Sequence, residues 1–313
     1  MKMQTRKLGN SDMLITPIGI GTWAIGGPDG NYNWGPQDDQ DSIKAIHRAV
    51  DLGVNWVDTA PAYGRGHSEE VVGKALQGLS HKPYVFTKNS LAWGEDRVIK
   101  NNLKADSVRK ECEDSLRRLG VEALDLWQIH WPNPDPDIEE GWVEMAKLKK
   151  EGKVRWIAVS NFTVAQMRRA QAIAPVTSLQ PPYSAVRRDI EKEILPFCAQ
   201  NQIGVIVYSP MQAGLLSGRM TRERIQNMAP TDWRRNNDQF QEPQLTRNLS
   251  MQDLFSKIGA RHGHSAGVAA LAWVLHRPEV IGAIVGVRNP QQIEDLIPAG
   301  DFRLTPAEIA EIG

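Results

Sequence analysis

Four residues of this chain carry side chains that together could protonate a substrate oxygen. Asp58, Tyr63, Lys88 and His130 each lie at, or just after, the end of a short apolar segment. A free tyrosine has a pKa of about 10 and donates its proton poorly at neutral pH, but a neighbouring ammonium such as Lys88 stabilises the anion and lowers that pKa. Asp58 would provide the counter-ion of Lys88, and His130 would donate a hydrogen bond to the substrate oxygen. The set predicts proton transfer to an oxygen that gains negative charge.

Each of these residues, taken alone, is more often structural. An isolated aspartate usually caps a turn, a loop tyrosine or a lysine at a strand end usually faces solvent, and a buried histidine usually has its hydrogen bonds satisfied. What favours a site is that all four follow consecutive strands, because parallel strands bring their C-terminal ends to one face. We therefore expect the four side chains to converge.

The elements that would position them alternate along the chain, as short β-branched apolar runs between amphipathic helical stretches. The predicted strands are Ile18–Trp23, Asn55–Asp58, Tyr84–Lys88, Leu124–His130, Val154–Ser160, Ser178–Gln180, Gly204–Tyr208 and Val280–Val287. The predicted helices are Asp41–Leu52, Ser68–Gln77, Asp106–Leu119, Asp137–Lys150, Val164–Ala172, Ile190–Gln200, Met251–Ala260, Ala266–His276 and Pro290–Ile297. Eight such units, with no G-x-G-x-x-G turn after the first strand, predict an α/β protein with a (β/α)8 TIM barrel as its single domain, residues 1–313.

Two further segments are expected at the ends of this barrel. Residues 7–15 are typical of a β-hairpin with its turn at Gly9-Asn10-Ser11, which would cover the bottom of the barrel. The long polar connection Gly218–Ser250 follows the seventh strand, so it leaves from the face on which barrel enzymes carry their active sites. A connection of this length is usually a lid or a disordered spacer, and we predict a lid over a ligand.

The composition excludes several classes of function. The 313 residues contain 37 basic and 37 acidic side chains, so no basic field exists to attract nucleic acid. No apolar run approaches the ~20 residues that span a bilayer, and the N-terminus shows no signal peptide, which predicts a cytoplasmic protein without a membrane partner. Cys112 and Cys198 lie in helical segments away from other metal ligands, so we predict core thiols and no metal site.

Several motifs carry a resemblance to a known family. They are Asp58-Thr-Ala-x-x-Tyr63-Gly64, Thr87-Lys88, Ile129-His130-Trp131-Pro132, the run from Gly152 to Phe162 that contains Ser160-Asn161, and Ala270-Leu-Ala-Trp273. In this order, and over essentially the whole chain, the sequence resembles the aldo-keto reductase family, particularly its bacterial and plant-type branches. The resemblance implies NADPH-dependent reduction of an aldehyde or ketone, with Tyr63 as the general acid and Lys88 lowering its pKa. It also implies that Asp58 pairs with Lys88, that His130 orients the carbonyl, and that the hydride comes from the nicotinamide.

The resemblance further implies which residues contact an NADP(H) molecule extended across the barrel mouth. Ser160, Asn161 and Gln180 match positions that bind the carboxamide, and Tyr208 matches the aromatic on which the nicotinamide stacks. The residues from Tyr208 to Arg219 resemble the family's pyrophosphate loop, with backbone N–H groups near Gly214 and Leu216 facing phosphate oxygens. The implied cofactor contacts are Gly21, Thr22, Trp23, Asp58, Ser160, Asn161, Gln180, Tyr208, Ser209, Pro210, Met211, Gly214, Leu216, Gly218, Arg219, Gly286, Arg288, Gln292 and Asp295.

The end of the eighth strand bears on the choice between NADPH and NADH. Arg288 precedes a predicted helix, so an arginine and exposed N–H groups would meet the 2′-phosphate there, which favours NADPH. The chain departs from many relatives at Val285, where they have Pro, and at Asp295-Leu296, where they have Glu-Asn. The second departure removes a hydrogen-bonding side chain near the adenine.

The substrate site is expected to be walled by aromatic side chains. The predicted substrate contacts are Trp23, Tyr63, Trp93, His130 and Trp131, and Trp34 and Trp233 are further candidates for this wall. Packing at the barrel rim would explain each tryptophan as well. Aromatic walls suit apolar carbonyls, aromatic carbonyls and sugars, so the predicted partner is a small carbonyl compound. The resemblance implies a monomer or a weak homo-oligomer.

Three other functions stay open at this point. Lys88 could form a Schiff base in an aldolase barrel, although the positions that match nicotinamide contacts would then be unexplained. His262-Gly263-His264 could suggest a metallohydrolase, but these residues lie at a helix turn without converging carboxylates. Finally, some proteins with this fold are NADPH-binding regulatory subunits of potassium channels with slow turnover; the four intact residues favour an enzyme.

Overall fold

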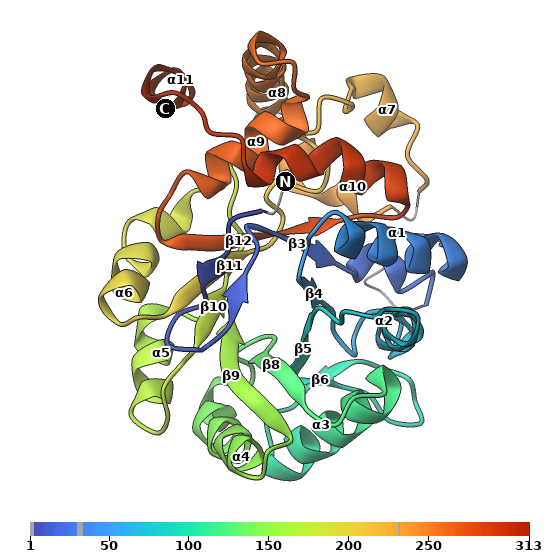
Figure 1. Ribbon diagram of the computed structural model, residues 1–313, viewed down its shortest axis with the longest axis vertical. Helices are drawn as coiled ribbons and strands as arrows, with labels where there is room; N and C mark the ends of the chain where they lie inside the picture. Colours follow the sequence, from blue (N-terminus) through green and yellow to red (C-terminus); the bar gives the residue numbers. More distant parts are fainter. Residues whose placement is uncertain (1–2, 30–33, 231) are drawn as a thin grey trace.

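Eight parallel strands close into a barrel at the centre of the structure, a computed structural model that describes residues 3–29, 34–230 and 232–313. Each strand pairs with the next barrel strand along the chain, and the last pairs with the first (Figure 1). The strands are β3 (Ile18–Gly21), β4 (Trp56–Asp58), β5 (Tyr84–Asn89), β8 (Leu124–Ile129), β9 (Val154–Ser160), β10 (Ser178–Gln180), β11 (Gly204–Val207) and β12 (Val280–Gly286). The predicted (β/α)8 barrel is confirmed.

Helices surround this barrel on its outside (Figure 1). They are α1 (Asp39–Asp51), α2 (His67–Gln77), α3 (Ala105–Leu119), α4 (Ile138–Lys150), α5 (Val164–Gln171), α6 (Ile194–Gln200), α8 (Gln244–Arg261), α9 (Ala266–Leu275) and α10 (Pro290–Leu296). The short α7 (Arg222–Gln226) lies in the connection after β11, and the short α11 (Pro306–Ile312) is the last element of the chain. Turns of 3-10 helix occupy Trp23–Ile25, Asp135–Asp137, Asp189–Glu191, Trp233–Asn236, Asp238–Phe240 and Ile297–Gly300.

Several predicted elements end earlier or start later than expected, among them the first barrel strand and one helix. The first barrel strand stops at Gly21, so Trp23 lies in a 3-10 turn rather than in the strand. The predicted helix Ile190–Gln200 is divided, and α6 begins only at Ile194. Pro196 explains the late start, because proline lacks an N–H group and is tolerated in the first turn of a helix but not in its interior.

Helix α3 illustrates why the outer helices form where the sequence places them. Val108, Cys112 and Leu119 share one face and are fully buried against the barrel. Gly120 then adopts a left-handed conformation (φ 64°) and ends the helix. Cys112 is a free buried thiol, as is Cys198 on α6.

The predicted N-terminal hairpin closes the N-terminal end of the barrel. Strands β1 (Arg6–Lys7) and β2 (Leu14–Ile15) pair antiparallel. A guanidinium nitrogen of Arg6 donates a hydrogen bond to the carbonyl of Val280, the first residue of β12 (2.7 Å). Hairpin and barrel interior share one apolar cluster, which contains Leu8, Met13, Ile15, Trp56, Phe86, Leu126, Ala158, Ile206 and Ile284. The opposite end, at which the strands terminate, is therefore the face available for a site.

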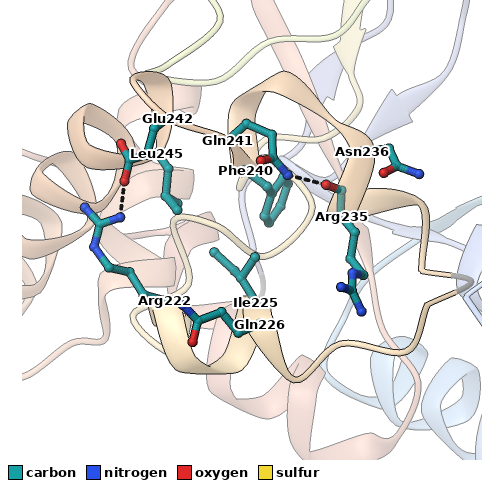
Figure 2. Close-up of a pocket in the computed structure, with 9 residues that line it drawn as sticks. All are labelled: Arg222, Ile225, Gln226, Arg235, Asn236, Phe240, Gln241, Glu242 and Leu245. Atoms are coloured by element: carbon teal, nitrogen blue, oxygen red, sulfur yellow. Dashed lines mark hydrogen bonds and ion pairs between the residues drawn. The ribbon is translucent and has the colours of Figure 1, made fainter.

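The long connection Gly218–Ser250, here called the post-β11 segment, has a folded core of its own. Besides α7 and two 3-10 turns, it contains the start of α8, which begins at Gln244 rather than at the predicted Met251. Its apolar side chains Met220, Ile225, Met228, Phe240 and Leu245 cluster together with Leu215, which precedes the segment. Figure 2 shows three of them beside a surface pocket that is bordered by the ion pair of Arg222 with Glu242. The scattered apolar residues thus belong to a small satellite core, not to a disordered spacer.

Glu111, on the barrel side of α3, is expected to make the stability depend on pH. It is almost fully buried, and burial raises the pKa of its carboxyl to about 8. Between the pKa of the unfolded chain, about 4.3, and this value, only the folded protein keeps the proton, so its stability falls as the pH rises. We expect Glu111→Gln to remove this loss of stability. From pH 5 to pH 8 the unfolding free energy of the variant should therefore gain roughly 4 kcal/mol relative to that of wild type.

Urea unfolding at pH 5, 6.5 and 8 measures this difference. Glu113→Gln changes an exposed glutamate of the same helix, with 53% of its side chain accessible, and should keep the wild-type pH dependence. A Glu111→Gln protein with the same pH dependence as wild type would show that the Glu111 carboxyl is already ionised in the fold.

Candidate active site

Asp58, Lys88 and Tyr63 form a chain of contacts inside the barrel mouth. Nζ of Lys88 donates hydrogen bonds to Oδ1 of Asp58 (2.5 Å) and to the backbone carbonyl of Thr59 (2.9 Å), and it lies 3.5 Å from the hydroxyl oxygen of Tyr63. The side chains of Lys88 and Asp58 are 0% and 3% exposed. The ammonium group is therefore fixed between a carboxylate and a phenol.

Neighbouring strands and one tight turn set this geometry. Asp58 ends β4, which pairs in parallel with β5, the strand that carries Lys88. Tyr63 lies in the turn after β4, and Gly64 follows it with φ of 63°. A Cβ on Gly64 would lie only 1.9 Å from the carbonyl oxygen of Gly26, so only glycine allows this close approach. The Tyr63-Gly64 pair thereby holds the phenol against the end of the barrel.

The electrostatics differ in one respect from the expectation that Lys88 lowers the pKa of Tyr63. Burial raises the pKa of Tyr63 above its ordinary value, and the Lys88 ammonium offsets only part of this rise. Burial alone would lower the pKa of Lys88, but the Asp58 carboxylate and Tyr63 raise it above its usual range. At neutral pH the phenol is therefore protonated and the amine is charged, which is the state that a proton donor needs.

His130 completes the group that the sequence predicted to converge. It directly follows β8, and its ring meets that of Tyr63 edge to face, with centroids 5.8 Å apart. Burial, with a contribution from the Lys88 charge, lowers the pKa of His130 well below its usual value, so the imidazole is neutral. Its buried Nδ1 has no hydrogen-bond partner in the part of the chain that the structure describes.

Two buried glutamines hold Asp58, and one of them was not predicted. Nε2 of Gln128 and Nε2 of Gln180 each donate to Oδ2 of Asp58 (2.9 and 2.8 Å), and Gln180 also donates to Oε1 of Gln128 (3.1 Å). Gln128 lies two residues before His130, hence on the same side of the chain, and a polar residue inside an apolar strand was the signal available. Gln180 was expected to bind a carboxamide, yet its amide nitrogen here serves the carboxylate.

The other residues that match carboxamide and stacking positions also lie together. The hydroxyl of Ser160 donates to the backbone carbonyl of Gln180 (2.8 Å), and Nδ2 of Asn161 donates to the carbonyl of His130 (3.0 Å). The Tyr208 hydroxyl donates to Oδ1 of Asn161 (3.0 Å), which fixes the orientation of a half-buried ring. Asn161 itself has φ of 63°, a left-handed conformation that asparagine tolerates better than most residues.

The segment after β11 has a tight backbone with several residues in the left-handed region. Ser209, Gln212 and Ala213 all have positive φ values. The N–H of Leu216, which was expected to face a phosphate, instead donates to the carbonyl of Met211 within the turn (3.1 Å). The remaining predicted residues of this segment are Pro210, Gly214 and Gly218. Two other predicted cofactor contacts lie at the end of the first barrel strand: Gly21 ends β3, and the N–H of Thr22 donates to the carbonyl of Asp58.

An ion pair connects the two predicted phosphate-side regions. Nη2 of Arg219 lies 2.7 Å from Oδ2 of Asp295 on α10. At the start of the same helix, Nε of Arg288 donates to Oε1 of Gln37 (2.6 Å), and its N–H donates to Oε1 of Gln292 (2.7 Å). The helix N-terminus is less open than expected, because the Asn289 side chain already accepts from the N–H of Gln292. Gly286 ends β12 next to them, and no atom of the described residues lies within 4 Å of where its Cβ would be.

The predicted aromatic wall is only partly assembled. Trp23 stacks near Tyr63 (centroids 6.4 Å apart), and Trp131, 40% exposed, stacks on His130 (6.3 Å). Trp93 instead follows β6 (Leu91–Ala92), which pairs with β7 (Lys100–Asn101), and its ring lies under the guanidinium of Arg118. Within the described ranges, no ring contact joins Trp93 to the other predicted substrate residues.

The structure shows no group of three or more His, Cys, Asp or Glu placed to hold a metal ion among the residues it describes. His262, which is partly exposed, contacts the buried carboxylate of Glu308 (2.7 Å). None of the helices described is both long and apolar enough to cross a membrane.

Known proteins resemble this chain over nearly its whole length. It is 38% identical to the aldo-keto reductase YhdN of Bacillus subtilis, over 94% of this chain and 88% of that protein. It is 34% identical to the NADH-specific methylglyoxal reductase of Escherichia coli, over 98% and 96%. The solved structure of the glycerol dehydrogenase AKR11B4 from Gluconobacter oxydans superposes on this chain with a TM-score of 0.91 at 39% identity. The match covers 100% of this chain and 94% of that one. The profile of the Aldo/keto reductase family matches residues 17–313, and the chain belongs to that family.

Proposed function

We propose that this protein reduces a small aldehyde or ketone to an alcohol with NADPH, and that Tyr63 donates the proton. The observation that carries the proposal is the buried Lys88 ammonium, held by Asp58 on one side and 3.5 Å from the Tyr63 hydroxyl on the other. A charge fixed beside a phenol stabilises the tyrosinate that forms when the proton leaves. In reverse, the same tyrosinate would accept the proton of an alcohol.

The steps follow from the protein groups. The Tyr63 hydroxyl and an imidazole N–H of neutral His130 both donate hydrogen bonds to the carbonyl oxygen, which polarises the carbonyl. As the carbon accepts a hydride, the oxygen gains an electron pair and takes the proton from Tyr63. Lys88 stabilises the phenolate left behind, and Asp58 keeps Lys88 charged. When bound, the nicotinamide supplies the hydride.

The residues present fit a nicotinamide cofactor. The Tyr208 ring, held by Asn161, offers a fixed stacking surface beside Ser160. Arg219 and Arg288 place two cations beside α10, where each contacts a residue of that helix. Nδ1 of His130 is a buried polar atom in the mouth, and no residue that the structure describes satisfies it.

The first test of this function is turnover of a carbonyl. Purified protein should oxidise NADPH, followed by its absorbance, in the presence of at least one member of a panel of aromatic, aliphatic and sugar aldehydes. Failure to bind either NADPH or NADH would overturn the proposal. Binding of NADPH without turnover of any aldehyde would also overturn it, in favour of a regulatory, cofactor-sensing protein of the same fold.

The preference for NADPH is a separate prediction, since one relative is NADH-specific. Arg288 is the cation offered to the 2′-phosphate, and we expect Arg288→Gln to raise KM for NADPH by about 10- to 100-fold, the effect of losing one hydrogen bond to a charged group. KM for NADH should change little, because NADH lacks this phosphate. Arg48→Gln, which removes an ion pair to Glu294 on the same helix, is the control and should alter neither constant. Equal changes for both cofactors would assign Arg288 a structural role.

A further inference from the structure

Arg288, beside α10, is held by neutral oxygen atoms. Its Nε donates a hydrogen bond to Oε1 of Gln37 (2.6 Å), and its Nη2 donates to the backbone carbonyl of Pro36. Throughout the described part of the chain, no carboxylate forms an ion pair with its guanidinium, whereas Arg48 and Arg219, which also contact α10, each pair with a carboxylate. The positive charge of Arg288 is therefore available to an anion.

Two connections that leave neighbouring strands bring Gln37 to this arginine. Strand β12 pairs with β3, and the last residues of the two strands, Gly286 and Gly21, lie opposite each other. Arg288 comes two residues after β12, and Gln37 lies in the connection from β3 to α1, which packs against α10 (Figure 1). The contact therefore forms at the mouth end of the barrel, between residues far apart in the sequence.

Further hydrogen bonds fix which end of the Gln37 amide faces the Arg288 side chain. Nε2 of Gln37 donates to the backbone carbonyl of Arg288 (2.8 Å) and to Oγ of Ser42 (3.1 Å). Ser42 is fully buried in the first turns of α1, and its hydroxyl donates in turn to the carbonyl of Asp38 (2.8 Å). A reversed amide would place Oε1 against the carbonyl oxygen of Arg288. Gln37 thus holds the side chain and the backbone of Arg288 together.

We propose that Gln37 determines the preference for NADPH, as a positioning residue that orients Arg288 without neutralising it. The inference rests on the proposed function. The remaining N–H groups of the guanidinium would bind the 2′-phosphate, and because the side chain is already held, less conformational entropy is lost on binding. A carboxylate at position 37 would bind the same Nε and compensate the charge that the phosphate needs, so the neutrality of the amide is what favours NADPH.

The test measures binding without any reaction. ADP-ribose and ADP-ribose 2′-phosphate lack the nicotinamide and differ only in the 2′-phosphate, and isothermal titration calorimetry gives a Kd for each. We expect Gln37→Glu to lower the preference for the phosphorylated ligand, taken as the ratio of the two Kd values, by about tenfold or more. Gln37→Met removes the hydrogen bonds without adding a charge and should lower the ratio about two- to tenfold, the effect of leaving one flexible side chain to be ordered on binding. The Kd of ADP-ribose should stay near that of wild type in both variants.

The matched control makes the same charge change on a neighbouring exposed residue. Gln40 lies in the first turn of α1 and faces solvent, where a new charge is screened, so Gln40→Glu should keep the wild-type ratio. NADPH and NADH, titrated by fluorescence, should show the same order of selectivity: wild type first, then Gln37→Met, then Gln37→Glu. An equal fall of the ratio in Gln40→Glu would overturn the specific role of Gln37.

Arg288→Gln separates the ways in which the inference could fail. If Arg288→Gln loses the selectivity while both Gln37 variants keep it, the role of Gln37 is overturned and the preference for NADPH stands. If the Gln37 variants lose affinity for both ligands equally, Gln37 is structural only and the inference is also overturned. If wild type binds the two ligands equally, there is no phosphate site to position, although turnover with NADH would leave carbonyl reduction standing. Wild type that binds neither NADPH nor NADH would overturn the proposed function itself.

Discussion

Tyr63→Phe is expected to lower kcat for carbonyl reduction by about 10²- to 10⁴-fold, the range that general acid catalysis contributes. The substitution removes one oxygen from a phenol whose ring already lies among Trp23, His130 and Lys88. The ring contacts should persist, so binding of NADPH, measured by fluorescence titration, should stay within a few-fold of wild type. Steady-state rates with the best aldehyde of the panel measure the loss.

A second tyrosine provides the control for this substitution. Tyr84 begins β5, at the opposite end of the strand from Lys88, and its ring faces Arg155. Tyr84→Phe should therefore keep the wild-type rate. If Tyr63→Phe kept more than about a tenth of the wild-type kcat, another group would have to supply the proton, and His130 would be the next to test.

The same assignment predicts the pH profile of wild type. Because burial raises the pKa of Tyr63, the phenol keeps its proton through neutral pH and above. Because burial lowers the pKa of His130, the imidazole does not titrate near neutrality. We therefore expect kcat for reduction to be flat between about pH 6 and pH 9, although an ordinary histidine, with a pKa of about 6.5, would titrate within this range.

The barrel and the convergence of its polar residues could be predicted because both follow from local patterns. Short β-branched runs specify strands, and a charged residue at the end of such a run must lie at the mouth once the strands are parallel. Asp58 and Lys88 were recognised in this way, and the structure places their side chains 2.5 Å apart. The sequence also showed Gly64, but not that it must pass within contact of Gly26.

What could not be predicted depends on tertiary burial. The direction of the Tyr63 pKa required knowing that burial outweighs the neighbouring charge, and this balance is not visible in residue types. Gln128 carries no chemical signal of its own, since a neutral amide matters here only through the carboxylate that it contacts. The post-β11 segment resisted prediction because its apolar residues serve short turns, so their spacing follows no helical period, and the stacking of Trp233 on Trp23 joins positions far apart in the chain.

The second large effect is expected on stability, from the buried pair of Asp58 and Lys88. Asp58→Asn leaves the Lys88 ammonium buried without a counter-ion, and removing one partner of a buried pair typically costs about 3 to 5 kcal/mol. Lys88→Met leaves the Asp58 carboxylate with its two glutamine donors, Gln128 and Gln180, so its loss should be smaller. The double variant has no buried charge at this place, and we expect it to be more stable than Asp58→Asn alone. Reduction should be lost in all three proteins.

The pH dependence separates this electrostatic effect from damage to packing. In wild type, the Asp58 carboxylate raises the pKa of Lys88 above its unfolded value, so the contribution of the pair is present at neutral pH and is lost only as the pH rises through the folded pKa. In Asp58→Asn, burial acts on Lys88 unopposed and lowers its folded pKa below about 10.4, the value in the unfolded chain. The unfolded chain then binds the extra proton, so the stability of this variant relative to the double variant should rise from pH 7 to pH 9.5. Urea unfolding at the two pH values measures this, and a relative stability that stays constant would mean that Lys88 keeps its proton in the folded Asp58→Asn protein up to pH 9.5, so that burial does not lower its pKa there.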